Sequence, residues 1–211
     1  MAAGFAQDLS RMLPGLLSLS LLLGLFIQIL GDQYIRRQQK RAILWIIALS
    51  ASLVAQNAAE YALWAAGGAP LLRTLVSIYG YCVRPVLIVL FYAVVSDGER
   101  TRAAWTLTGL NALVYLTALF SPLAFRFEGN AFKRGPLGFS CHVITGVLLL
   151  QLLFLILRKC RKTPGQTVIP VFNVLLIVAA TVVDTVGYDV PYTFVTGAVV
   201  CSTMLFYNWL H

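Results

Sequence analysis

Charged and amide side chains interrupt the long apolar runs of this chain at a few points. These points include Gln56, Asn57 and Glu60 in one run, Arg84 in the next, and His142 and Asp184 further along. An ionisable side chain at membrane depth costs about 2.5–3.5 kcal/mol on insertion scales, so it faces the interior of a helix bundle and often marks function. Side chains of these types bind ligands through charge and hydrogen bonds. They are therefore the first candidates for a binding site.

The composition places these residues in a membrane protein. The chain of 211 residues is 59% hydrophobic and only 11% charged, which is too little charge to cover a soluble domain. Apolar runs of about 18 to 25 residues are long enough to cross a hydrocarbon core. The seven runs are residues 14–31, 42–66, 71–95, 103–120, 139–157, 166–186 and 191–210. We predict an all-α bundle of seven transmembrane helices that forms one domain over residues 1–211.

The basic residues predict how this bundle is oriented. Ten Lys and Arg lie in the connections after the first, third and fifth runs, and five lie on the other side. Basic residues favour the cytoplasmic face, so we expect the N-terminus outside and the C-terminus in the cytoplasm. Three of the five outside charges are Arg126, Lys133 and Arg134. Their segment therefore has a task other than setting topology.

Glu60 and Arg84 are predicted to meet inside the bundle. A rise of about 1.5 Å per residue places Glu60 about 9 Å and Arg84 about 20 Å below the outer ends of their helices. The long arginine side chain can span that difference. An ion pair, direct or through Gln56, Asn57 or water, is expected because either charge alone would be costly there. Pro85 follows Arg84 and predicts a kink at the same depth.

Two interpretations of this pair stay open. It could only hold two helices in register, or it could form the floor of a polar cavity that opens to the outside. Polar residues near the outer end and nearby aromatic side chains favour the cavity, although the same aromatics could be ordinary packing. The predicted ligand-binding residues are Asn57, Glu60, Tyr61, Trp64, Tyr81, Arg84, Arg134, His142 and Asp184.

The segment Phe125–Phe139 predicts a small β-hairpin outside the membrane, between the fourth and fifth helices. Two short alternating stretches flank the turn residues Gly129 and Asn130. We expect one face to pack on the bundle and the other to point to water: Phe125, Phe127 and Phe132 inward, Arg126 and Lys133 outward. The hairpin would then act as a lid over the outer cavity, with Arg134 near its mouth.

Three short segments resemble a known family. They are Arg134–Leu137 (RGPL) after the hairpin, Asn57, Glu60 and Tyr61 in the second run, and Tyr81–Pro85 (YCVRP) in the third. With the seven runs, they resemble the N-terminal seven-helix membrane domains of bacterial signalling proteins, which precede histidine-kinase or diguanylate-cyclase modules. The resemblance implies a sensory domain in the bacterial plasma membrane. The sequence ends at His211, so we expect the cytoplasmic output module to be fused in a longer chain or to be a separate partner.

The expected ligand is a small extracytoplasmic molecule, and the basic loop and Arg84 favour an anion. A small transporter with a three-plus-one-plus-three arrangement of helices and a structural membrane subunit stay open as alternatives, as does a homodimer. The four cysteines have no CxxC or Cys/His spacing, so neither a metal site nor a cofactor is predicted. No deep Ser–His or paired-acid arrangement is present, so we do not expect an enzyme. The positive charge lies between apolar runs and predicts contact with lipid rather than nucleic acid.

Overall fold

Helices make up most of the described chain, which is 84% helical. The computed structural model describes residues 2–96, 101–129, 131–160, 164–186 and 193–210. The helices within these ranges are α1 (Ala2–Gly31), α2 (Arg37–Ala66), α3 (Pro70–Ser96), α4 (Arg102–Leu116), α5 (Ser140–Lys159), α6 (Val168–Val186) and α7 (Thr193–Leu210). Two strands, β1 (Phe125–Glu128) and β2 (Ala131–Arg134), and two short 3-10 helices at Thr117–Leu119 and Pro164–Thr167 complete the described elements.

The predicted seven helices and the hairpin are confirmed, with differences at the helix starts. α1 begins at Ala2 rather than at residue 14, and α2 begins at Arg37, inside the predicted basic connection. Hydropathy marks only the apolar part of a helix, whereas backbone hydrogen bonding continues through polar residues at low cost. The sequence also predicts a tight turn at residues 187–191 (GYDVP), which lie outside the described residues.

Four of the described helices are long and apolar enough to cross a membrane. These segments are Leu13–Gly31, Arg37–Ala66, Pro70–Ser96 and Ser140–Lys159. The apolar stretches of α6 and α7 are shorter, and α4 has 15 residues before its 3-10 extension. Pro85 lies inside α3, which continues through it to Ser96.

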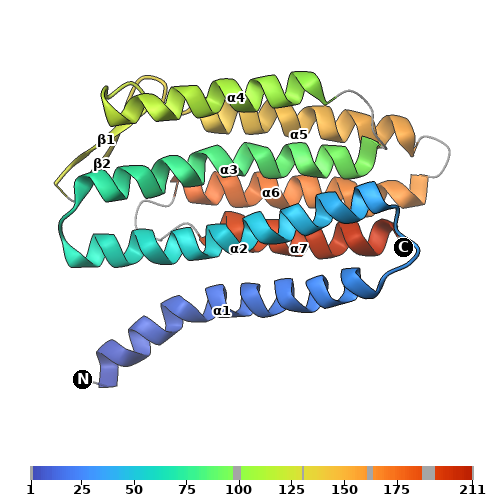
Figure 1. Ribbon diagram of the computed structural model, residues 1–211, viewed down its shortest axis with the longest axis horizontal. Coiled ribbons are helices and arrows are strands. Elements are labelled where there is room, and N and C mark those ends of the chain that lie inside the picture. The colour runs from blue at the N-terminus through green and yellow to red at the C-terminus, as the bar shows by residue number, and fades with distance from the viewer. Residues whose placement is uncertain (1, 97–100, 130, 161–163, 187–192, 211) are drawn as a thin grey trace.

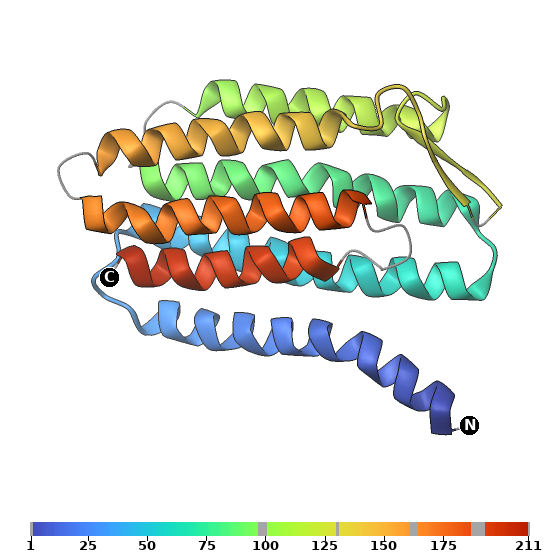
Figure 2. The same ribbon diagram turned by 180° about the vertical axis from the view of Figure 1, so that it is seen from behind.

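Five helices form a closed ring in which each contacts the next: α2, α3, α5, α6 and α7, with α7 returning to α2. α4 packs outside α3 and α5, and α1 packs outside α2 and α7. Figures 1 and 2 show the helices aligned along the long axis of the molecule, with the N-terminal part of α1 bending away from the bundle. Apolar side chains from the ring and from α1 fill the main core, among them Leu25, Ile46, Val89, Leu152 and Phe206.

The hairpin lies at one end of the bundle, and its pleat decides which residues face the helices. Antiparallel pairing places Phe125 opposite Arg134 and Phe127 opposite Phe132. Because successive strand residues point to opposite faces, these four share the inner face. Phe125 is fully buried, and Phe127 and Phe132 are half-buried against a second apolar cluster. The outer face carries Arg126, Lys133 and Glu128, which form an exposed group of ion pairs. The predicted inward and outward faces are confirmed.

Two glycines hold the hairpin close to the end of α4. A Cβ on Gly135 would collide with the carbonyl oxygens of Pro122 and Leu123, and one on Gly138 would lie 2.7 Å from that of Ala124. Gly135 also donates its backbone N–H to the Ala124 carbonyl at 2.9 Å. The segment that returns from β2 to α5 is therefore seated directly against the segment that leaves α4.

Candidate functional site

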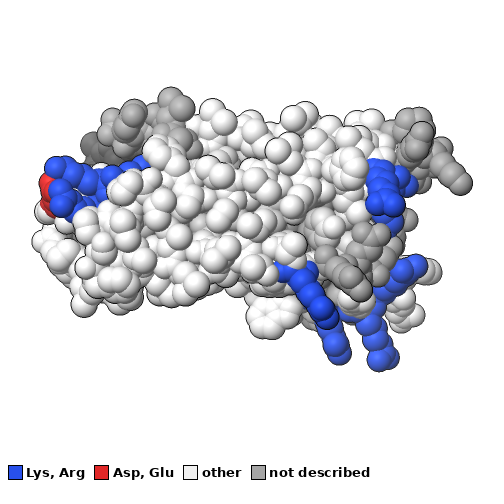
Figure 3. Space-filling model, turned by 90° about the horizontal axis from the view of Figure 1, so that it is seen from above, with Lys and Arg blue, Asp and Glu red and all other residues white. Residues whose placement is uncertain are grey.

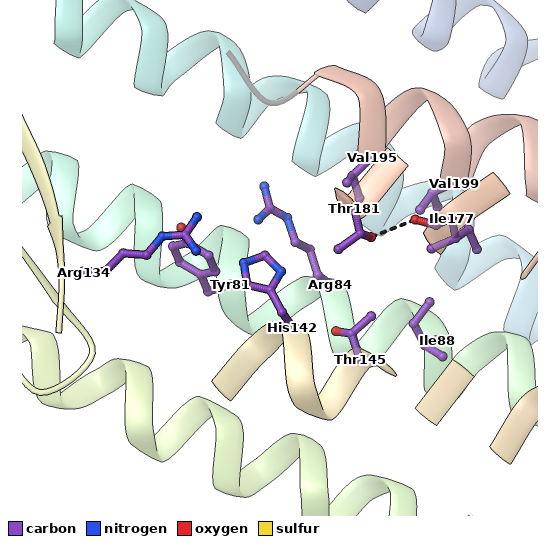
Figure 4. A pocket seen from close by; sticks show the side chains of 10 residues that line it. All are labelled: Tyr81, Arg84, Ile88, Arg134, His142, Thr145, Ile177, Thr181, Val195 and Val199. Carbon is purple, nitrogen blue, oxygen red and sulfur yellow. Dashed lines mark hydrogen bonds between the residues drawn. The ribbon is translucent and has the colours of Figure 1, made fainter. Parts of the chain in front are cut away.

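A small cavity of about 30 Å³ lies inside the ring of helices, toward the hairpin. Figure 4 shows the side chains around it, which come from α3, α5, α6, α7 and β2. They are Tyr81, Arg84, Ile88, Arg134, His142, Thr145, Ile177, Thr181, Val195 and Val199. Four of the nine predicted site residues, Tyr81, Arg84, Arg134 and His142, thus lie around one space.

Basic and aromatic groups gather on the side of the cavity nearest the hairpin. The Arg84 guanidinium carbon lies 5.3 Å from the centre of the Tyr81 ring, and that of Arg134 lies 4.6 Å from the centre of the Phe139 ring. A guanidinium within about 6 Å of a ring is attracted by its negative face. The His142 ring lies between these arginines in Figure 4, and its Nε2 is buried without a hydrogen-bond partner among the described residues.

The opposite side of the cavity is apolar. Ile88, Ile177, Val195 and Val199 contribute only hydrocarbon surface. The Thr181 hydroxyl also lines this side, and it donates to the Ile177 carbonyl at 2.8 Å, as the dashed line in Figure 4 marks. The cavity is therefore basic on the side of the hairpin and apolar on the opposite side. Because the apolar side lowers the local dielectric constant, electrostatic interactions with a ligand are stronger here than in water.

Tyr81 connects the cavity to the hairpin. Its ring stacks on Tyr115 with centroids 4.4 Å apart, and it also contacts Phe125 and Phe132 at 5.9 and 6.4 Å. Its backbone carbonyl accepts hydrogen bonds from the Asn111 amide at 3.0 Å and the Cys141 thiol at 3.4 Å. One residue of α3 therefore touches the cavity, α4, α5 and both strands of the hairpin.

Glu60 belongs to a separate polar cluster between α2 and α3. Its carboxylate accepts hydrogen bonds from the Gln56 amide at 2.8 Å and the Ser77 hydroxyl at 3.1 Å. Gly80 leaves the space that the Gln56 amide occupies, since a Cβ there would lie 3.0 Å from it. The direct ion pair with Arg84 is not among the contacts of the described residues. Arg84 instead attracts the carboxylate from a longer distance.

The other predicted residues of α2 do not line the cavity either. Asn57 donates its side-chain amide to the Thr196 hydroxyl of α7 at 2.9 Å. Tyr61 and Trp64 lie against each other with ring centroids 6.0 Å apart, and Trp64 is 48% exposed. Asn57, Glu60, Tyr61 and Trp64 therefore do not line this cavity with Arg84, and their role in ligand binding stays a prediction. Asn57 instead faces α7, and Glu60 faces α3.

Asp184 lies in α6, one turn beyond Thr181, but its side chain is outside the described residues, as is the whole of Asp189. Its predicted role stays a prediction.

Arg73 is the residue that sequence reasoning missed. Arg73 lies in the first turn of α3, is 5% exposed, and its guanidinium carbon lies 4.2 Å from the centre of the Phe127 ring. It also attracts the Glu60 carboxylate. Arg73, Ser77 and Arg84 are spaced by four and seven residues. That spacing puts them on one face of a helix, and it was the available signal.

Comparison of the chain with protein-family models, curated proteins and solved structures finds no match.

Proposed function

We propose that the chain is a seven-helix transmembrane sensor that binds a ligand on the extracytoplasmic side and moves α7. The observation that carries the proposal is the cavity under the hairpin. It is lined by basic groups from α3, α5 and β2 and walled in part by α7 itself. A ligand there would contact both the lid and the helix that runs to the other end of the bundle.

Charge distribution supports insertion in a membrane with the hairpin outside. Figure 3 shows Lys and Arg side chains gathered at the two ends of the molecule, with a broad uncharged zone between them on that face. The end opposite the hairpin has the larger share of basic residues in the sequence, ten against five, which favours it as the cytoplasmic end. The four long apolar helices meet the length requirement for spanning.

α7 contacts both the cavity and the neighbouring helices through which a shift could be transmitted. Val195 and Val199 form part of the cavity wall, while Thr196, between them, accepts the hydrogen bond from Asn57 of α2. At the other end of α7, the Tyr207 hydroxyl donates to the Asp32 carboxylate at 3.1 Å. Both ends of α7 are thus held by directional bonds that a shift of the helix would break or remake.

The ligand must distinguish two arrangements of the helices. A ligand shifts an equilibrium only by the difference in its binding free energy for the two states, and a tenfold shift requires about 1.4 kcal/mol. The hairpin offers such a difference, because Arg134 approaches the cavity only when β2 is seated. The expected output partner is a kinase or cyclase module at the cytoplasmic end of α7, fused or separate.

The test is a distance measurement on the whole chain in lipid nanodiscs. Spin labels carried by genetically encoded amino acids replace Tyr34 and Asn208, both exposed near the end opposite the hairpin. Sodium chloride, nitrate and acetate are added in turn against a gluconate control. At least one is expected to change the distance in the wild type and to leave it unchanged in Arg84→Gln.

A bound anion without any change in that distance would contradict the sensor. Accumulation of the same anion, radiolabelled, inside sealed proteoliposomes would identify the chain as a transporter instead.

A further inference from the structure

We infer that the cavity holds a single halide-sized anion, chloride in ordinary surroundings, bound by Arg84, Arg134 and His142 under the seated hairpin. The inference rests on the proposed function, because it names what the same cavity binds. It adds a definite size, charge and set of donors to a ligand otherwise described only as small.

The volume limits the ligand to a few atoms at most. The cavity measures about 30 Å³, and by the same measure a cavity that holds one water needs about 10–15 Å³. A monatomic anion fits that space. A carboxylate or phosphate group has three or more non-hydrogen atoms around its charge and would fit only if the hairpin lifted.

The lining supplies positive charge and hydrogen-bond donors but no described negative charge. Arginine stays protonated in proteins, and each guanidinium carries five N–H groups. The His142 ring nitrogen, buried and without a described partner, can donate a further bond to a ligand in the cavity. None of the ten lining side chains is acidic. Two arginines and no acid are among the lining side chains, which favours an anion over a cation.

The apolar walls make this charge effective. Ile88, Ile177, Val195 and Val199 keep bulk water from the far side of the cavity. Attraction between an anion and an arginine is several times stronger in such surroundings than in water, and removal of one partner leaves a costly buried charge. An anion bound in the cavity is therefore stabilised more strongly than an anion bound at the exposed basic groups of the hairpin.

The three donors come from three elements, so the anion also joins them. Arg84 is on α3, His142 is the third residue of α5, and Arg134 is the last residue of β2. Arg134 is held in place by the Phe139 ring, which precedes α5. Binding would tie the hairpin to α3 and α5, and release would free it.

The experiment titrates sodium chloride into the whole chain in nanodiscs, with sodium gluconate replacing it at constant ionic strength. Binding is followed directly by broadening of the ³⁵Cl resonance and independently by the melting temperature. Wild type is expected to show saturable broadening and a saturable rise in melting temperature. Bromide competes, whereas gluconate and sulfate do not.

Matched variants test the donors. Arg134→Gln is expected to weaken chloride binding at least tenfold, while Arg126→Gln, on the outer face of the same hairpin, leaves it within twofold. Arg84→Gln should also weaken it at least tenfold, and Arg84→Lys covers the case in which Arg84→Gln does not fold. Asp184→Asn, which removes an acid of α6 three residues after Thr181 in the sequence, should leave the affinity unchanged or raise it.

Equal effects of Arg134→Gln and Arg126→Gln would overturn the inference, as would loss of chloride binding in Asp184→Asn. Tighter binding of acetate than of chloride would overturn the size limit and leave the sensor standing. Saturable chloride binding with an unchanged distance between positions 34 and 208 would leave the anion site standing and refute the sensor.

Discussion

Tyr81 is the residue through which the hairpin and the cavity meet. Tyr81 is 5% exposed, and its ring packs with Tyr115, Phe125 and Phe132. The same residue also lines the cavity beside Arg84. Aromatic pairs of this kind contribute about 0.5–1.5 kcal/mol beyond their burial. A ligand that moved Tyr81 would therefore disturb the seat of the hairpin, and a lifted hairpin would loosen one wall of the cavity.

The contacts of Glu60 give a prediction about energetic coupling. Glu60 touches Ser77 but only attracts Arg84 from a distance. In double-mutant cycles, residues in contact couple by about 0.5–3 kcal/mol, and more distant residues by a few tenths. The Glu60→Gln and Ser77→Ala cycle should therefore give the larger coupling in the free energy of unfolding in mixed detergent. A larger value for Glu60→Gln with Arg84→Met would instead indicate the direct ion pair expected from the sequence.

Side-chain identity predicted part of the site, and helix rotation decided the rest. Tyr81, Arg84 and His142 could be predicted because a charge or an amphipathic ring inside an apolar run must face the interior. Arg134 could be predicted from its place at the end of the hairpin. Glu60 and Asn57 obey the same rule but face a different interior, one toward Ser77 of α3 and the other toward Thr196 of α7. In a membrane helix the lipid-facing and buried sides are both apolar, so the sequence pattern does not tell which neighbour a polar residue meets.

The hairpin is an element whose position depends on glycine rather than on hydrogen bonding alone. Gly135→Ala would place a methyl group against the carbonyls of Pro122 and Leu123. We expect a loss of about 1–3 kcal/mol in stability and a lifted hairpin. Cys141, 1% exposed beneath it, should then react faster with a water-soluble maleimide. Gly146→Ala in α5 is the control, since a Cβ there meets nothing within 4 Å and the reaction rate should not rise.

The outer face of the hairpin predicts a response to acid. The hydrogen bond from Lys133, aided by the Arg126 charge, holds the pKa of Glu128 below its ordinary value of 4.5. Because the folded-state pKa is lowered, the ion pairs stabilise the hairpin above the unfolded pKa and are lost as pH falls through the folded one. A spin label at Ala131 should gain mobility below about pH 4.5, where an unfolded glutamate takes up its proton. Glu128→Gln should abolish this pH dependence; an unaltered transition in that variant would assign it to another group.

Element types were predictable because each follows from a local rule. Apolar runs of membrane length predicted all seven helices, and the alternation around Gly129 predicted the strands, their inner and outer faces and the turn. The starts of α1 and α2 were not predictable from hydropathy, because Ala2–Met12 and Arg37–Arg41 are polar or mixed segments that continue a helix. The close contact of Gly135 with residues 122–124 was not predictable either, because only folding of the chain brings these residues together.

On the scale of the whole molecule, α7 is hydrogen-bonded to α2 at one end and to the α1–α2 connection at the other. Tyr207→Phe would remove the bond to Asp32, at a cost of about 1 kcal/mol. The last turn of α7 should then exchange its amide hydrogens about fivefold faster, as mass spectrometry can measure. Tyr92→Phe, near the same end of α3, should leave that exchange unaltered. Equal protection in wild type and Tyr207→Phe would show that the bond does not hold α7.

The contacts of α7 also bear on how the chain is assembled during synthesis. α7 closes the ring by returning to α2, and it shares with α2 the contact with α1. The ribosome makes α1 and α2 before α3 to α6, and α7 after them, so the ring cannot close until α7 has been made. Until then the cavity lacks Val195 and Val199, and Asn57 lacks Thr196. Closure of the ring therefore waits for α7, and a nascent chain stalled before α7 should be the form most easily recognised by quality-control proteases.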